Sequence, residues 1–244
     1  MTPEIIEILT ALMLGFLHAL EVDHMLAVTT FVAGRPSLGT AARFGFRWGV
    51  GHSLAVLALG GILLVTGIRW PERYDAIGEG VVGLMLVALG LWALRSSRKL
   101  HLHVPSEHGD HAHLHLHGGP AAHGHPHRET HPEPVEHHHP SAPAHEHRHP
   151  GHGITLVGLM HGFAGSSGVV ALVPVTLIRR VDVGFAYLAA FGVGVTAGMM
   201  VYAVVAAFAM RQAAARSLRW GRRITALVGV AGVVVGVMWV WRAV

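Results

Sequence analysis

The chain contains no cysteine among its 244 residues, and only 13% of its residues are charged. The absence of thiols excludes disulfide bonds and thiolate metal sites. Without cysteine, the sequence also does not indicate whether the protein works in an oxidising or a reducing compartment. A soluble domain carries about 25% charged residues, so charge is scarce here. The residues are instead 52% hydrophobic, and the mean hydropathy is +0.47. This composition is typical of an integral membrane protein.

Long apolar runs with few charges account for this composition. They cover residues 5–33, 45–68, 77–95, 153–178, 183–210 and 224–242. Each run reaches about 20 residues, the length that crosses the hydrocarbon core as a helix, and helices satisfy their own backbone amides in lipid. We therefore expect an all-α integral membrane protein with six transmembrane helices.

The basic residues predict how these helices are oriented in a cell membrane. Thirteen of the eighteen Lys and Arg residues follow the first, third and fifth runs. The positive-inside rule then places both termini outside and the long segment 96–152 in the cytoplasm. Because the arginines cluster at the ends of apolar runs, the formal charge of +4 is a topology signal and does not indicate nucleic acid.

The segment 101–152 differs from the rest of the chain. It holds eighteen of the 22 histidines and eight of the 12 prolines, without apolar periodicity. Such a composition predicts a disordered loop, and histidine-rich tracts bind divalent transition metals. We expect the loop to buffer metal, the alternative being a solubilising linker. The densest runs supply the candidate ligands His111, His113, His115, His117, His137, His138 and His139.

An internal repeat relates the segments on either side of this loop. GFLHAL at 15–20 matches GLMHGF at 158–163, and WGVGHS at 48–53 matches FGVGVT at 191–196, both at an offset of 143 residues. The glycine pair Gly83 and Gly90 recurs as Gly229 and Gly236, at an offset of 146. Two units of three spans each must lie upside down relative to one another, an architecture of secondary transporters.

The repeat predicts the domain organisation. Residues 1–99 form the first three-helix repeat, 100–152 the histidine-rich cytoplasmic loop, and 153–244 the second three-helix repeat. The polar residues are unevenly shared, because Glu21, Asp23 and His24 correspond to Ala164, Ser166 and Ser167, and His52 corresponds to Val195.

Polar residues within the apolar runs are the candidates for function. Four histidines lie outside the loop, and all of them fall in expected spans: His18, His24, His52 and His161. The stretch HALEVDH at 18–24 adds Glu21 and Asp23 to the first span. On a straight helix the rise from His18 to His24 is about 9 Å, too long for one ion unless the backbone opens or another span contributes. The stretch contains no Gly or Pro that demands a break.

The energetic penalty of these acids points to a metal ion. An ionised acid at the bilayer centre costs roughly 2.5–3.5 kcal/mol on insertion scales. A divalent cation would neutralise Glu21 and Asp23 together, and imidazoles would complete a shell suited to Ni²⁺, Co²⁺ or Zn²⁺. Asp23 would either orient a ligand histidine through its second ring nitrogen or bind directly if the helix unwinds. We predict an intramembrane metal site with the candidate ligands His18, Glu21, Asp23, His24, His52 and His161.

Two alternatives to this site remain open. The charged stretch would instead lie in water if the first run formed two short hairpin helices. His52 and His161 would instead join helices through hydrogen bonds, as single intramembrane histidines often do.

HALEVDH fits the pattern H-x4-D-H and resembles the signature of the nickel/cobalt transporter family, which usually has Asp at the position of Glu21. GVGHS at 49–53 is similar to the histidine motif in that family's second helix. The resemblance implies transport of Ni²⁺ or Co²⁺ into bacterial or archaeal cells, with His18, Asp23, His24 and His52 in the metal path. It also implies the metal ion as substrate, no prosthetic group and no catalysis. A cytosolic metallochaperone is the one protein partner that such a function suggests.

The chain departs from this family in ways that leave the direction of transport open. The expected spans are fewer than is common, and the second half carries GFAGSSG at 162–168 in place of an acid-rich motif. In these respects the chain resembles the urease-accessory type of nickel permease. The histidine-rich loop is similar to that of the related nickel/cobalt efflux proteins, whose first motif has Pro-Gly where this chain has Val22 and Asp23. The acid retained at Asp23 favours uptake.

Two other classes of function compete with transport. GSSG at 165–168 fits the serine motif of rhomboid intramembrane proteases, which take their base from a histidine in the sixth span. Residues 224–244 contain no histidine, so His52 or His161 would have to substitute. A membrane metal sensor would show metal binding without flux.

Overall fold

The computed structural model describes residues 2–33, 37–68, 73–98, 100–103, 113–116, 151–164, 175, 177–178 and 180–244. The described membrane part is all-helical, as the sequence predicts. The helices are α1 (Pro3–His18), α2 (Val22–Ala33), α3 (Leu38–Thr66), α4 (Arg73–Arg98), α5 (Gly151–Ala164), α7 (Val181–Arg216) and α8 (Leu218–Arg242). A short hairpin of β1 (Leu100–His103) and β2 (His113–Leu116) lies between α4 and α5 in the chain.

Four helices within the described ranges are long and apolar enough to cross a membrane: Leu38–Thr66, Ala76–Ser97, Val181–Arg216 and Trp220–Arg242. The pair α1 and α2 qualifies together as a fifth span. The fourth expected run, 153–178, is described as a helix over Ile154–Ala164, which is shorter than a full crossing, and residues 165–174 lie outside the described part. The chain is thus a multi-pass membrane protein.

The first span is broken at the motif, which answers the question that the sequence left open. Helix α1 ends with Ala19 as its C-cap, whose N–H donates to the Gly15 carbonyl, and α2 starts at Val22. The two helices meet at an angle of 56°. Asp23 lies in the first turn of α2, where the positive end of the helix dipole favours a carboxylate.

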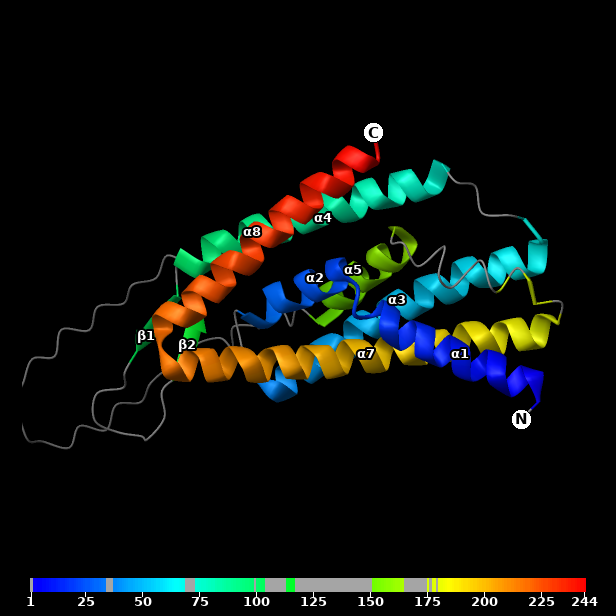
Figure 1. The fold of residues 1–244 in the computed structure, drawn as a ribbon, viewed down its shortest axis with the longest axis horizontal. Helices are drawn as coiled ribbons and strands as arrows, with labels where there is room; N and C mark the ends of the chain where they lie inside the picture. Colours follow the sequence, from blue (N-terminus) through cyan, green and yellow to red (C-terminus); the bar gives the residue numbers. More distant parts are fainter. Residues whose placement is uncertain are drawn as a thin grey trace, which may run out of the picture.

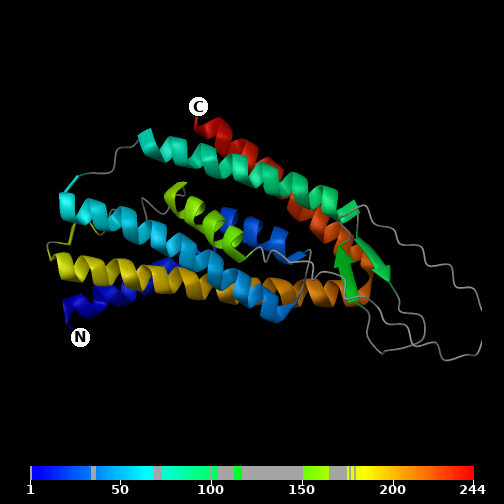
Figure 2. The ribbon, with the colours of Figure 1, turned by 180° about the vertical axis from the view of Figure 1, so that it is seen from behind.

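The helices are arranged in three layers (Figures 1 and 2). Helices α1, α3 and α7 form one layer, and the antiparallel pair α4 and α8 forms the opposite one. The shorter helices α2 and α5 lie between them, with α5 packed mainly against α3. The break in the first span and the last turns of α5 therefore meet in the interior of the molecule.

Glycines allow the backbones of α4 and α8 to approach closely. A Cβ added at Gly83 would lie 2.7 Å from the Gly236 carbonyl oxygen, and one added at Gly90 would lie 2.6 Å from that of Gly229. Such small-residue contacts are how helices associate in lipid. Many large apolar side chains on the outer surface are exposed, including Val65 at 68% and Leu227 at 68%, as expected for a lipid-facing surface.

The described residues of the histidine-rich segment are the hairpin and the last two residues, Gly151 and His152, which begin α5. Strands β1 and β2 pair antiparallel, with His101 opposite His115 and His103 opposite His113. The hairpin was not foreseen, because the composition of the whole segment predicts disorder. Disorder remains a prediction for residues 104–112 and 117–150, which lie outside the described residues and include His111, His117 and His137–His139.

Candidate metal centre

The break in the first span brings four histidines and one aspartate into a single buried cluster. His18 is the last residue of α1, Asp23 and His24 begin α2, His52 lies in the middle of α3, and His161 lies in the last turn of α5. Their residues are between 0% and 2% exposed. The structure thus brings the two histidines of the motif close to the two histidines of α3 and α5.

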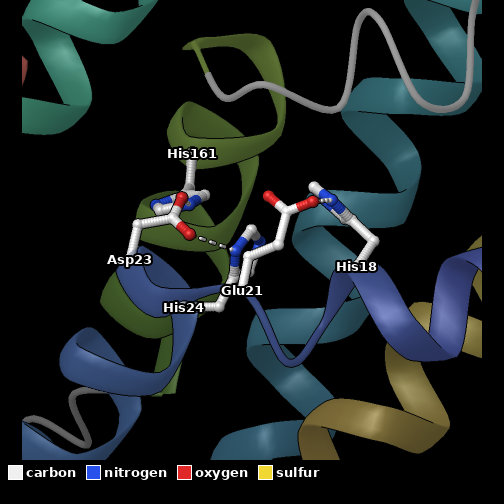
Figure 3. A network of polar contacts seen from close by, with 5 residues as sticks. All are labelled: His18, Glu21, Asp23, His24 and His161. Carbon is white, nitrogen blue, oxygen red and sulfur yellow. Dashed lines mark hydrogen bonds and ion pairs between the residues drawn. The ribbon is translucent and has the colours of Figure 1, made fainter.

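His24 lies at the centre of this cluster. Its ring centroid is 4.3 Å from that of His161, 4.7 Å from that of His18 and 5.1 Å from that of His52. Figure 3 shows His24 between His18 on one side and the pair Asp23 and His161 on the other. The 9 Å rise that separates His18 from His24 on a straight helix is removed by the break.

Asp23 links two helices through its carboxylate. Its Oδ1 lies 3.1 Å from His24 Nδ1, and its Oδ2 lies 2.9 Å from His161 Nε2 (Figure 3). The aspartate therefore orients two imidazoles, one of the roles that the sequence suggested. His161 does join helices through a hydrogen bond, as one alternative expected, but its partner is the acid of the motif.

The six remaining imidazole nitrogens have no hydrogen-bond partner within the described part of the chain. They are His18 Nδ1 and Nε2, His24 Nε2, His52 Nδ1 and Nε2, and His161 Nδ1. Each buried polar atom left unpaired costs about 1–3 kcal/mol. His52 makes no described hydrogen bond at all, so the alternative in which it joins helices finds no support. A neutral imidazole has one nitrogen lone pair, so each of these rings offers one ligand atom that a metal ion would satisfy.

Glu21 lies at the edge of the cluster. Its Oε1 is 2.9 Å from His18 Nδ1, an ion-pair distance without the angles of a hydrogen bond. The Glu21 side chain is 34% exposed, unlike the other candidate ligands. The motif is therefore not a cluster in open water, and its more accessible side is the side of Glu21 and His18.

Two aromatic residues at the cluster were not among the predicted site residues. The Trp48 ring lies 5.7 Å from that of His161, and the Phe191 ring lies 5.6 Å from that of His18. Both side chains are 0% exposed and close the cluster against water. Their signal was present in the repeat, because each is the first residue of a matched segment, WGVGHS or FGVGVT.

The geometry offers two groups of three ligands in the described part of the chain. One group is His18, His24 and His52, and the other is Asp23, His24 and His161, and within each the ligand atoms lie within 4.8 Å of one another. The GSSG stretch at 165–168 lies outside the described residues. Fold and site together define the class: a multi-pass membrane protein with a buried centre of imidazoles and one carboxylate.

Two curated proteins are similar to this chain. The urease accessory protein UreH of Bacillus sp. (strain TB-90) is 27% identical over 203 residues, covering 80% of this chain and 75% of the relative. A Methanocaldococcus jannaschii protein named "Putative nickel/cobalt efflux system" is 33% identical over 112 residues, covering 44% of this chain and 50% of the relative. These relatives confirm the resemblance to the nickel/cobalt transporter family, and neither carries the name of an enzyme, in agreement with the expected absence of catalysis.

No protein-family profile matches the chain, and no solved structure matches it. The comparisons give no support to the rhomboid alternative.

Proposed function

We propose that this protein is a transmembrane transporter of divalent transition-metal cations, Ni²⁺, Co²⁺ or both, that moves them through the buried His/carboxylate cluster. The observation that carries the proposal is the cluster itself. Four imidazoles and a carboxylate, 0–2% exposed, converge where the first span is broken, and six of their nitrogens lack a hydrogen-bond partner among the described residues. Discontinuous helices at a central site are a recurrent feature of secondary transporters.

The ligand chemistry favours this class of ion. Imidazole nitrogens with a carboxylate oxygen suit Ni²⁺, Co²⁺ and Zn²⁺, whereas Cu⁺ favours thiolate and thioether sulfur. The chain has no cysteine, and its candidate ligands are nitrogen and oxygen atoms. The name of the second relative supports nickel or cobalt within this group. In this proposal His18, Asp23, His24, His52 and His161 hold the ion, and Glu21 assists from the exposed edge.

Uptake is the proposed direction, on the ground that Asp23 is retained in the motif. Export is the second candidate, and the observation that favours it is the efflux name of the archaeal relative. Both directions use the same buried ligands, so they make the same prediction for variants of the cluster. They differ in whether the protein raises or lowers the metal content of a cell.

We propose six spans arranged as two inverted repeats, and contacts between the halves support this. A Cβ added at Gly15 would meet the Phe191 carbonyl, and one added at Gly158 would meet the Trp48 carbonyl. At the 143-residue offset Gly15 corresponds to Gly158, and Phe191 corresponds to Trp48. The second contact is therefore the repeat counterpart of the first. A structure with a pseudo-two-fold axis has such paired contacts.

Further contacts follow the same rule. Ser53 and Thr196 are repeat mates, and their hydroxyl oxygens lie 3.3 Å apart. The repeat also relates the two close contacts between α4 and α8, because the contact of Gly83 with Gly236 corresponds to that of Gly229 with Gly90.

The proposed orientation has both termini outside and the histidine-rich loop in the cytoplasm. In Figures 1 and 2 the hairpin lies at one end of the molecule and the N-terminus at the opposite end. Metal buffering by the loop is supported by the strand register, which brings His101, His103, His113 and His115 to neighbouring cross-strand positions. A cytosolic metallochaperone stays a prediction from the resemblance.

The test is accumulation of ⁶³Ni by cells with and without the protein. An importer raises and an exporter lowers the internal counts relative to cells without it. His18→Ala, Asp23→Asn and His24→Ala should each abolish the change, because each removes a ligand. The matched control is Thr10→Ala, an exposed hydroxyl whose bond is to its own helix. Unchanged transport in the three cluster variants would reject the proposal.

A further inference from the structure

The buried ligands divide into two triads that share one residue, and this division suggests how an ion moves. We propose that the transported ion occupies two alternating positions and stays bound to His24 as it passes from one to the other. This inference rests on the proposed function and adds a path within the site. Position A is the triad His18, His24 and His52, and position B is the triad Asp23, His24 and His161.

Both positions have the dimensions of a metal site. Metal–nitrogen and metal–oxygen bonds are about 2.0–2.2 Å long, so two ligands of one ion lie at most about 4.4 Å apart. The ligand atoms of each triad already lie within 4.8 Å of one another. Small rotations of the side chains would therefore close either position around an ion.

His24 has the geometry of a shared ligand. Its Nδ1 lies 3.1 Å from Asp23 Oδ1, on the side of position B, whereas its Nε2 has no hydrogen-bond partner among the described residues. Its ring lies between those of His18 and His161, at centroid distances of 4.7 Å and 4.3 Å (Figure 3). His24 is thus within ligand distance of the other two residues of both positions.

The two positions differ in charge. Position A consists of three imidazoles, whereas position B includes the carboxylate of Asp23. An ion in position A has no carboxylate among its three ligands. When it passes to position B, it exchanges the imidazoles of His18 and His52 for the imidazole of His161 and the carboxylate of Asp23. The positions are therefore chemically distinct, and their ligand sets can be told apart in solution.

The two positions also differ in access. Glu21, with a side chain that is 34% exposed, lies 2.9 Å from His18 Nδ1 in position A. Position B lies under Trp48, which is 0% exposed and 5.7 Å from the His161 ring. The structure thus gives an order: the exposed carboxylate, then position A, then position B.

The experiment uses the purified full-length chain in detergent, with Co²⁺ as the probe. Bound Co²⁺ is counted by equilibrium dialysis, and its ligand set is followed by visible absorption. Removing His24 with His24→Ala destroys both positions, so this variant measures the background from the loop histidines and is subtracted from every other spectrum. Size-exclusion chromatography verifies that each variant is folded.

Each position is removed by two variants that leave the other position intact. Position A is lost in His18→Ala and in His52→Ala, and position B is lost in Asp23→Ala and in His161→Ala. With two variants for each position, one that fails to fold does not end the test. We expect the wild type and all four variants to bind one Co²⁺ more than His24→Ala does.

The spectra should then fall into two pairs. The variants that keep position A should absorb at shorter wavelength, because three nitrogen ligands give a stronger field than two nitrogens and one oxygen. All four variants should lose flux in vesicles, since each lacks one of the two positions.

Other outcomes would overturn the inference. If the four variants lose the additional Co²⁺, or if their difference spectra are the same, the ligands form one site and the ion has no second position. Failure of the proposed function looks different: the wild type would then bind no more Co²⁺ than His24→Ala and would show no flux.

Discussion

The contact between Asp23 and His161 gives a prediction whose size follows from the structure. The Asp23 residue is 0% exposed, and its Oδ2 lies 2.9 Å from His161 Nε2 on another helix. Neutral hydrogen bonds between membrane helices contribute about 0.6 kcal/mol on average, with a maximum near 1.7 kcal/mol. A hydrogen bond to a charged group contributes about 1.5–3 kcal/mol. We therefore expect a coupling free energy of about 1.5–3 kcal/mol between these two side chains.

A double-mutant cycle measures this coupling. The free energy of unfolding is determined in metal-free mixed micelles for the wild type, Asp23→Ala, His161→Ala and the double variant. The control cycle uses Ser53 and Thr196, a neutral hydroxyl pair at 3.3 Å between α3 and α7, whose coupling should stay near 0.6 kcal/mol. A coupling for Asp23 and His161 no larger than that of the control would refute the view that a charged carboxylate organises the cluster.

Two further predictions concern packing and the loop. Gly51→Val should lower the stability by about 1–3 kcal/mol and abolish flux, because the added Cβ would meet the backbone of Thr155 on α5, the helix that carries His161. Gly39→Val, at a position with open space around it, should change neither the thermal midpoint nor the flux. Deletion of residues 101–150 should alter capacity or regulation in a ⁶³Ni assay and leave translocation intact. Complete loss of translocation would contradict the accessory role of the loop.

Composition and local pattern were sufficient to predict much of the membrane part. Apolar runs predicted helices because hydrocarbon demands internally satisfied backbones, and five of the expected spans have described counterparts that qualify as crossings, counting α1 and α2 together. The four intramembrane histidines stood out because polar groups are costly in lipid. The structure brings all four together with Asp23.

The break in the first span could not be predicted from the motif, because HALEVDH contains no Gly or Pro. The break lies beside a tertiary contact, that of Asp23 with His161, which is 138 residues further along the chain. Local propensity carries no information about such a partner. For the same reason His52 and His161 could be named as candidates but not assigned to a ligand set.

The aromatic residues at the cluster illustrate another limit. Trp48 and Phe191 are apolar residues in apolar runs, so composition gives them no special role. The repeat alone marked them, as the paired first residues of two matched segments. The hairpin was missed because strand pairing of Leu100–His103 with His113–Leu116 is too short and too rich in histidine to stand out in a proline-rich segment.

The most direct test of the account is metal flux through the purified protein in vesicles that contain a metal-sensitive dye. Wild-type protein should move Ni²⁺ or Co²⁺ across the bilayer, and vesicles with His24→Ala should not differ from empty ones, because both ligand triads depend on this imidazole. Equal flux with and without the His24 imidazole would contradict the account.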